Sequence, residues 1–165
     1  MSGRTPVFFS LPGTIKSGQR FDRLISTHDI YPTILDYAGA EIPKTAAGRS
    51  LRPVMEGKEA KSRETLFGAI YPAFATKDDN RPERDVYALY ARTKEWKYIF
   101  YTQDVQQKRN GKYFRIQSIE TAFPERAKGD EDLYNLSSDP YELKNLSKDP
   151  AHRERMNELR KQTLK

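Results

Sequence analysis

The chain has 165 residues, of which 36% are hydrophobic, and a net charge of +6. This length allows one domain with a core, or a domain with an attached segment, and is too short for most hydrolases built on a large doubly wound sheet. The chain has no cysteine, which excludes disulfides, thiolate metal sites and a cysteine nucleophile. No stretch approaches the roughly 18 apolar residues of a membrane span, and the N-terminus lacks a signal-peptide pattern, so we expect no membrane association.

The first part of the chain predicts a strand followed by a helix. Residues 7–9 form a short apolar run bounded by proline, which is typical of a buried strand closed by a turn. Residues 30–39 place their apolar side chains on one helical face, and Gly39 suits the position just after the helix end. The proline in this segment requires a nearby helix start, which favours His28 or Asp29 as the N-cap.

A second short helix and an edge strand are expected next. Residues 50–56 predict a helix that is N-capped by Ser50, with a proline in its first turn. Residues 58–64 are predicted to be charged and exposed. Residues 66–74 are mostly apolar and predict a strand, which Pro72 either ends or places at a sheet edge.

The strongest strand signal lies in the middle of the chain. Residues 86–92 and 96–101 alternate in side-chain character, and a tight polar connection, 93–95, joins them, so they predict an antiparallel hairpin. The pair Asn110-Gly111 is the dipeptide that most readily adopts a type I′ turn, and it predicts a second hairpin.

The end of the chain predicts a last strand and a covering helix. Residues 133–136 are mostly apolar and predict a short strand, and two Asp-Pro stops follow them before a helical pattern over residues 151–164. The expected fold class is α+β: a strand and helix lead-in over residues 1–65, then a subdomain over residues 66–165. That subdomain should contain a small antiparallel sheet of about four strands with a covering C-terminal helix.

Three stretches resemble, in order, the C-terminal part of type I sulfatases. Residues 133–150 are similar to the closing signature of that family, LY-D/N-L-x-x-D-P-x-E-x-x-N-L. Residues 29–57 are similar to D-I-x-P-T-I-L-x-x-A-G followed by G-x-S-L-x-P-x-x-x-G, and residues 92–99 resemble R-T-x-x-x-K-Y-I. The resemblance implies a C-terminal portion of an arylsulfatase or glycan sulfatase of the alkaline phosphatase superfamily, without the N-terminal catalytic domain.

The resemblance also implies where the chemistry of the whole enzyme lies. The family makes formylglycine from Cys or Ser in a C/S-x-P-x-R motif and binds a divalent cation, usually calcium, through Asp or Asn oxygens. Residues 10–14 come nearest to the motif, but Thr14 stands where arginine is required. In the family the nucleophile and the metal ligands precede the strand that residues 7–9 resemble. We therefore expect no catalytic residue, metal ligand or cofactor in this chain, and no activity of the chain alone.

Four basic side chains around the Asn110-Gly111 turn are the candidates for binding a sulfated substrate at the rim of the whole enzyme's cleft. Guanidinium and ammonium groups pair well with sulfate oxygens, and loops on a rigid scaffold commonly carry such selectivity. A solvated basic hairpin explains the same pattern equally well. The candidates are Lys108, Arg109, Lys112 and Arg115.

We expect the two histidines and the two acidic runs of the sequence to have structural roles. His28 and His152 are far apart in sequence and have no metal-ligand partner at suitable spacing. The acidic runs 78–79 and 130–132 lack the fixed pattern of a calcium loop, so we expect solvated turns there.

The residues leave other functions open. The basic, aromatic hairpin would suit a polyanion-binding module for sulfated glycan or nucleic acid, although the charge is spread along the chain and no nucleic-acid motif is present. A fragment of a related phosphatase or phosphonate hydrolase would differ only in its missing half. The apolar lead-in, residues 7–9 and one face of residues 30–37, predicts self-association. Members of the sulfatase family are often exported or periplasmic, and the sequence leaves the localisation open.

Overall fold

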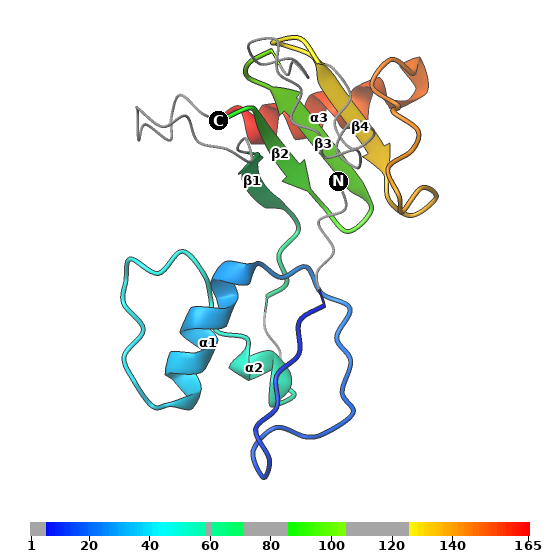
Figure 1. Ribbon diagram of the computed structural model, residues 1–165. Helices are drawn as coiled ribbons and strands as arrows, with labels where there is room; N and C mark the ends of the chain where they lie inside the picture. Colours follow the sequence, from blue (N-terminus) through cyan, green and yellow to red (C-terminus); the bar gives the residue numbers. More distant parts are fainter. Residues whose placement is uncertain (1–5, 59–60, 71–85, 105–125) are drawn as a thin grey trace, which may run out of the picture. The chain divides into compact units, whose positions relative to one another are not determined.

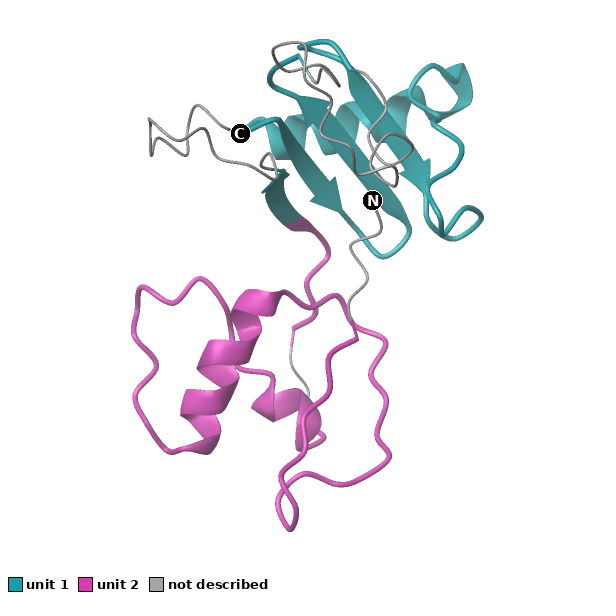
Figure 2. Ribbon diagram, viewed as in Figure 1, with its two compact units in different colours: residues 1–3, 67–165 teal, residues 4–66 magenta. Residues whose placement is uncertain are grey.

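A computed structural model of the chain describes residues 6–58, 61–70, 86–104 and 126–165 (Figure 1). The chain divides into two compact units, residues 4–66 and residues 67–165 together with 1–3 (Figure 2). Within the described ranges, no helix is both long and apolar enough to cross a membrane.

The unit of residues 4–66 is built on two short helices that polar caps position. Ser26 caps a single 3₁₀ turn, because its hydroxyl accepts from the His28 backbone N–H while the Asp29 carboxylate accepts from the backbone N–H of Ser26. The chain passes directly into α1, and Gly39, with φ 69°, ends that helix in the left-handed conformation that glycine adopts readily. The elements are the 3₁₀ turn Thr27–Asp29, α1 (Ile30–Tyr37) and α2 (Arg52–Met55).

Two predictions for this unit differ from the structure. Residues 7–9 form no strand, and the side chain of Phe8 is 89% exposed. A strand needs a neighbour for its backbone groups, and the described residues of this unit supply none. The second helix is shorter than predicted and has Leu51 at its N-cap, although the Ser50 hydroxyl does accept from the backbone N–H of Arg52 at 3.1 Å.

The second unit contains a four-stranded sheet in the order β1-β2-β3-β4 (Figure 1). The predicted central hairpin is confirmed, since β2 and β3 pair antiparallel with Tyr90 opposite Ile99. β4 pairs antiparallel with the other edge of β3 and places Asp132 opposite Ile99. The strands are β1 (Leu66–Ile70), β2 (Ala88–Arg92), β3 (Trp96–Tyr101) and β4 (Glu131–Asn135).

The C-terminal helix α3 (Arg153–Thr163) covers one face of this sheet (Figure 1). It follows a 3₁₀ turn, Pro150–His152, whose start is capped by the Asp149 carboxylate. Leu159 is fully buried against three side chains from successive strands, Ala91, Tyr98 and Leu133. The alternate side chains of the strands form a second buried cluster that includes Ile99 and Tyr134. The predicted α+β fold with a covering helix is therefore confirmed.

The segment after β4 turns back and protects the edge of that strand. The Asn145 side chain accepts from the Leu133 backbone N–H at 3.0 Å, and the Leu146 backbone N–H donates to the Leu133 carbonyl at 2.8 Å. The Asn135 side chain accepts from the backbone N–H groups of Ser137 and Ser138. Asn135 and Asn145 thus serve as turn caps, and the returning segment satisfies the Leu133 backbone groups at the edge of β4.

Candidate functional site

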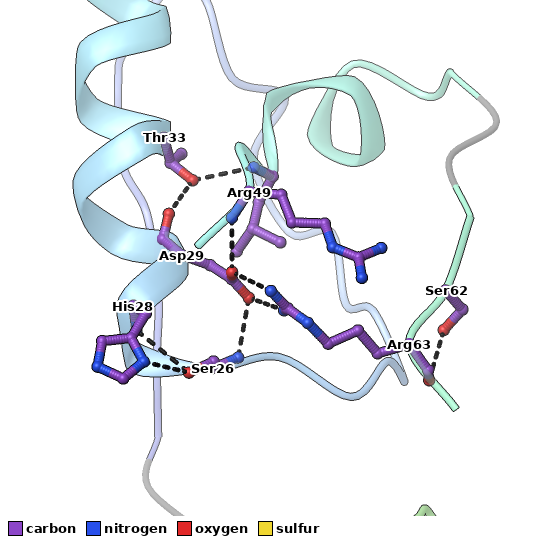
Figure 3. A network of polar contacts seen from close by, with 8 residues as sticks. Ser26, His28, Asp29, Thr33, Arg49, Ser62 and Arg63 are labelled. Atoms are coloured by element: carbon purple, nitrogen blue, oxygen red, sulfur yellow. Dashed lines mark hydrogen bonds and ion pairs between the residues drawn. The ribbon is translucent and has the colours of Figure 1, made fainter. Parts of the chain in front are cut away.

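A buried carboxylate organises the polar centre of residues 4–66 (Figure 3). Asp29 has 0% exposure and sits where the 3₁₀ turn meets α1. Its Oδ1 accepts from the Arg49 backbone N–H at 2.9 Å and from Arg63 Nη2 at 2.7 Å. Its Oδ2 accepts from the Ser26 backbone N–H at 2.9 Å and from Arg63 Nη1. One side chain therefore joins three segments that are distant in sequence.

The loop that reaches Asp29 is held by two further contacts. The Thr33 hydroxyl donates to the Asp29 carbonyl and accepts from the Leu51 backbone N–H at 2.9 Å. At Gly48 an added Cβ would lie 1.9 Å from the carbonyl oxygen of His28, so only glycine allows this close approach of two backbones.

The Asp29 carboxylate is suited to holding the fold, because both of its oxygens are occupied by internal donors. Burial acts to raise the pKa of Asp29, but the hydrogen bonds from Arg63 and from the Ser26 and Arg49 backbones outweigh it and keep the pKa below its ordinary value. Each carboxylate oxygen accepts two hydrogen bonds. The prediction that residues 58–64 are exposed is wrong for Arg63, whose side chain is 13% exposed because it pairs with Asp29.

A second buried carboxylate, Asp132, lies on β4 in the other unit. Its Oδ1 accepts from Arg126 Nε at 2.9 Å and from Asn145 Nδ2 at 2.6 Å. Its Oδ2 accepts from the hydroxyls of Tyr101 at 2.9 Å and Tyr134 at 3.2 Å. Burial and the nearby Asp132 charge raise the pKa of both tyrosines, so both hydroxyls remain protonated donors. The carboxylate is fully used in holding β3, β4 and the returning segment together.

The neighbouring residue Glu131 joins β4 to α3. Its carboxylate accepts two hydrogen bonds from the Arg160 guanidinium and one from the Tyr98 hydroxyl. Burial acts to raise the pKa of Glu131, but the bonds from Arg160 and Tyr98 outweigh it and lower the pKa. The covering helix is therefore fixed to the sheet by a charged contact as well as by Leu159.

This contact predicts an acid-sensitive stability. Because the pKa of Glu131 is lower in the folded state than its ordinary value of 4.5, the unfolded state binds more protons as the pH falls through that value. The stabilisation is complete above that pH and is lost as the pH falls through the folded pKa. We expect the urea midpoint, followed by Trp96 fluorescence, to fall further between about pH 6 and about pH 3 in the wild type than in Glu131→Gln. Equal falls would contradict the assignment.

A third charged pair, Lys97 with Glu142, is almost fully enclosed. The Lys97 ammonium donates to the Glu142 carboxylate, and the two side chains are 5% and 2% exposed. The pair joins β3 to the loop that follows β4. Sequence alternation alone placed Lys97 on a strand without indicating a partner 45 residues away.

The sequence-predicted substrate residues are not placed by the structure. Lys108, Arg109, Lys112 and Arg115 lie outside the described residues, as does the Asn110-Gly111 hairpin. They stay a prediction.

Both histidines and the acidic run 130–132 take structural places, whereas the acidic run 78–79 lies outside the described residues. The His28 ring nitrogen lies 3.3 Å from the Ser26 hydroxyl, and the His152 ring lies 5.2 Å from that of Trp96. In the acidic run 130–132, the Asp130 carboxylate accepts from a turn N–H, and its two neighbours are paired with arginines. Among the described residues, no group of three or more acidic or histidine side chains is arranged to hold a metal ion.

Comparison with known proteins places the chain in a family. Residues 1–110 match the family model of the N-sulphoglucosamine sulphohydrolase C-terminal region. An arylsulfatase of Clostridium perfringens is 29% identical over 99% of this chain and 27% of its own length. An ulvan-active sulfatase of Formosa agariphila is 27% identical over 91% of the chain and 30% of its length. Human arylsulfatase K is 29% identical over 88% of the chain and 23% of its length.

Solved structures show the same fold. A 2-O GAG sulfatase superposes with a TM-score of 0.60 at 25% identity, over 90% of this chain and 26% of that protein. A phosphonate monoester hydrolase from Silicibacter pomeroyi superposes with a TM-score of 0.64 at 21% identity, over 94% of this chain and 27% of that protein, a likeness that concerns the fold alone.

The matches to relatives and to solved structures have one feature in common. The chain spans between about a fifth and a third of each of these proteins, and the family model describes a C-terminal region. The chain therefore belongs to the N-sulphoglucosamine sulphohydrolase C-terminal family and corresponds to the C-terminal part of a sulfatase.

Proposed function

We propose that this chain completes a sulfatase that acts on sulfated glycans, and that its own role is structural support of a catalytic part located elsewhere. The carboxylates that the structure describes at Asp29, Glu131 and Asp132 are engaged in internal contacts. The motif that would supply a formylglycine nucleophile is missing from the sequence. Both observations support a structural role, in which the chain is stabilised by its own polar contacts and contributes surface to the enzyme.

The distribution of apolar side chains carries this proposal. Among the described residues, nine of the ten buried hydrophobic residues belong to the second unit, and only Met55 belongs to residues 4–66. The unit of residues 4–66 also exposes several large apolar side chains. A unit that buries so little has little to offset its conformational entropy, so we infer that its exposed apolar surface packs on the rest of the enzyme. These side chains are Phe8, Leu11, Phe21, Tyr31 and Ile34.

Membership of the family supports a proposal for the cofactor and the substrate class. We place the formylglycine and the calcium ion of the sulfatases in the catalytic part, outside these 165 residues. A sulfated glycan is the substrate class we propose, because relatives of this chain include an ulvan-active sulfatase and a 2-O GAG sulfatase. The basic residues Lys108, Arg109, Lys112 and Arg115 remain our candidates for contacts at the rim of the cleft.

The exposed apolar surface gives a prediction for the chain on its own. In the absence of a catalytic part we expect the chain to self-associate through residues 4–66, because association buries exposed apolar side chains away from water. Light scattering should show a mass that rises with concentration, and Ile34→Lys should reduce the association. A monomer at high concentration that binds no exposed-apolar dye would count against it.

Activity measurement tests the functional assignment. The purified chain is expected to give no turnover of an aryl sulfate, with or without added calcium. Turnover that a chelator abolishes would show that the chain carries its own catalytic site and would overturn the proposal.

A further inference from the structure

The loop after β4 is closed on itself by its own polar groups. The Asp139 carboxylate accepts from the Lys144 backbone N–H at 2.8 Å, and the Asp139 carbonyl accepts from the Glu142 backbone N–H at 3.2 Å. Backbone donors, that of Lys144 first, hold the pKa of Asp139 below its ordinary value. Residues 139–144 therefore form a compact loop whose ends lie within hydrogen-bonding distance of each other.

The middle of this loop is anchored inward. Glu142 has φ 60°, an uncommon conformation for a residue other than glycine, and its carboxylate is buried against the Lys97 ammonium on β3. The start of the segment is tied to the β2–β3 turn, because the Leu136 backbone N–H donates to the Glu95 carbonyl at 2.6 Å. The loop is thus fixed to the sheet from both ends and from its middle.

The side chains on either side of Glu142, those of Tyr141 and Leu143, are exposed to solvent. Tyr141 is 79% exposed and Leu143 is 84% exposed, and both are among the most exposed large apolar side chains that the structure describes. Lys144 is exposed as well, and within the described part of the chain its ammonium makes no hydrogen bond or ion pair. Both acids of the loop, Asp139 and Glu142, are occupied by internal donors. The loop therefore presents an aromatic ring, an apolar neighbour and one positive charge.

We propose that residues 139–144 form a binding site for a sulfated glycan chain, in addition to the contacts proposed for the basic segment 108–115. The ring of Tyr141 would cover the apolar face of a pyranose, and the ammonium of Lys144 would pair with a sulfate. This inference rests on the proposed function, since it names a second contact for the same class of substrate. The internal anchoring favours it, because a loop held rigid in advance loses little conformational entropy when it binds.

Binding by the 165-residue chain tests this site without any catalytic activity. The probe is a short heparin oligosaccharide, titrated below the concentration at which light scattering detects association, with its desulfated counterpart as comparison. We expect Tyr141→Ala and Lys144→Gln each to weaken heparin binding about tenfold, equivalent to about 1.4 kcal/mol. The affinity of the wild type for the desulfated probe should be no higher than the affinity of the two variants for heparin.

Matched controls separate the site from general basicity. Phe67→Ala removes a half-exposed aromatic ring of β1, and Lys161→Gln removes a charge on α3, so both should leave binding unchanged. Unchanged urea midpoints would show that Tyr141→Ala and Lys144→Gln are folded. Equal heparin binding by all four variants would overturn the site. A Tyr141→Ala variant that loses self-association and keeps heparin binding would also overturn it, because that result would assign the loop to a protein contact. Aryl-sulfate turnover by the chain alone would overturn the proposed function and leave this binding result standing.

Discussion

Asp29→Ala is expected to destabilise residues 4–66 by about 3–5 kcal/mol, the usual result of removing one partner of a buried ion pair. The variant would leave the Arg63 guanidinium enclosed without its carboxylate and would free the Ser26 and Arg49 backbone N–H groups. Hydrogen exchange is the direct measurement, because the amides of Arg49 and Leu51 are protected by this network in the native state. Both amides should exchange much faster in the variant.

Two further variants make the result specific to the buried site. Asp36 pairs with Arg52 at a more exposed position, so Asp36→Ala should change stability by at most about 1 kcal/mol. The double variant Asp29→Ala/Arg63→Leu removes the stranded charge and should recover part of the loss. If Asp29→Ala and Asp36→Ala had equal effects on exchange, the central role of Asp29 would be refuted.

Lys97→Met should lower the free energy of unfolding of the second unit by a similar amount, about 3–5 kcal/mol. The Glu142 carboxylate, 2% exposed, would stay enclosed after losing its contact with the Lys97 ammonium. The loop that Glu142 anchors should then detach from β3. Urea unfolding followed by the fluorescence of Trp96, the neighbour of Lys97 on the strand, measures the change.

The loop offers a matched comparison for this variant. Lys144→Met makes the same chemical change at an exposed position and should stay within about 0.5 kcal/mol of the wild type. Lys97→Met/Glu142→Gln should be more stable than Lys97→Met, since a neutral amide is less costly to enclose than a carboxylate. A Lys97→Met protein as stable as Lys144→Met would show that the pair is not a support of the fold.

The elements that depend on local pattern could be predicted from the sequence. The β2–β3 hairpin follows from side-chain alternation around a short polar turn, and its register places Ala91 opposite Tyr98. The covering helix follows from a Pro start behind Asp149 and an apolar stripe that includes Leu159. In each case residues close in sequence determine the structure.

The contacts that join distant segments could not be predicted in this way. Arg63 lies 34 residues from Asp29, and Glu142 lies 45 residues from Lys97, so no local spacing indicates either pair. The prediction of a strand at residues 7–9 was wrong for a related reason. A strand requires a partner strand, and the described part of this unit provides none.

The residues that identified the family are those that hold the chain together. Asp29 and Gly48 belong to the first sulfatase-like stretch, and both fix the loop that carries Arg49 to the start of α1. Asn145 belongs to the closing signature and links the Leu133 backbone to the Asp132 carboxylate. The signature thus reports a fold, because its residues make the contacts that join distant segments of the chain.

A chimera tests the central claim most directly. The matching C-terminal 27% of the Clostridium perfringens arylsulfatase would be replaced by this chain, and aryl-sulfate hydrolysis would be measured beside the parent enzyme and a truncation that lacks this part. We predict that the chimera is active and the truncation is not, and that Asp29→Ala in the chimera abolishes the gain. A folded, calcium-loaded chimera without activity, or a truncation as active as the parent, would contradict the account.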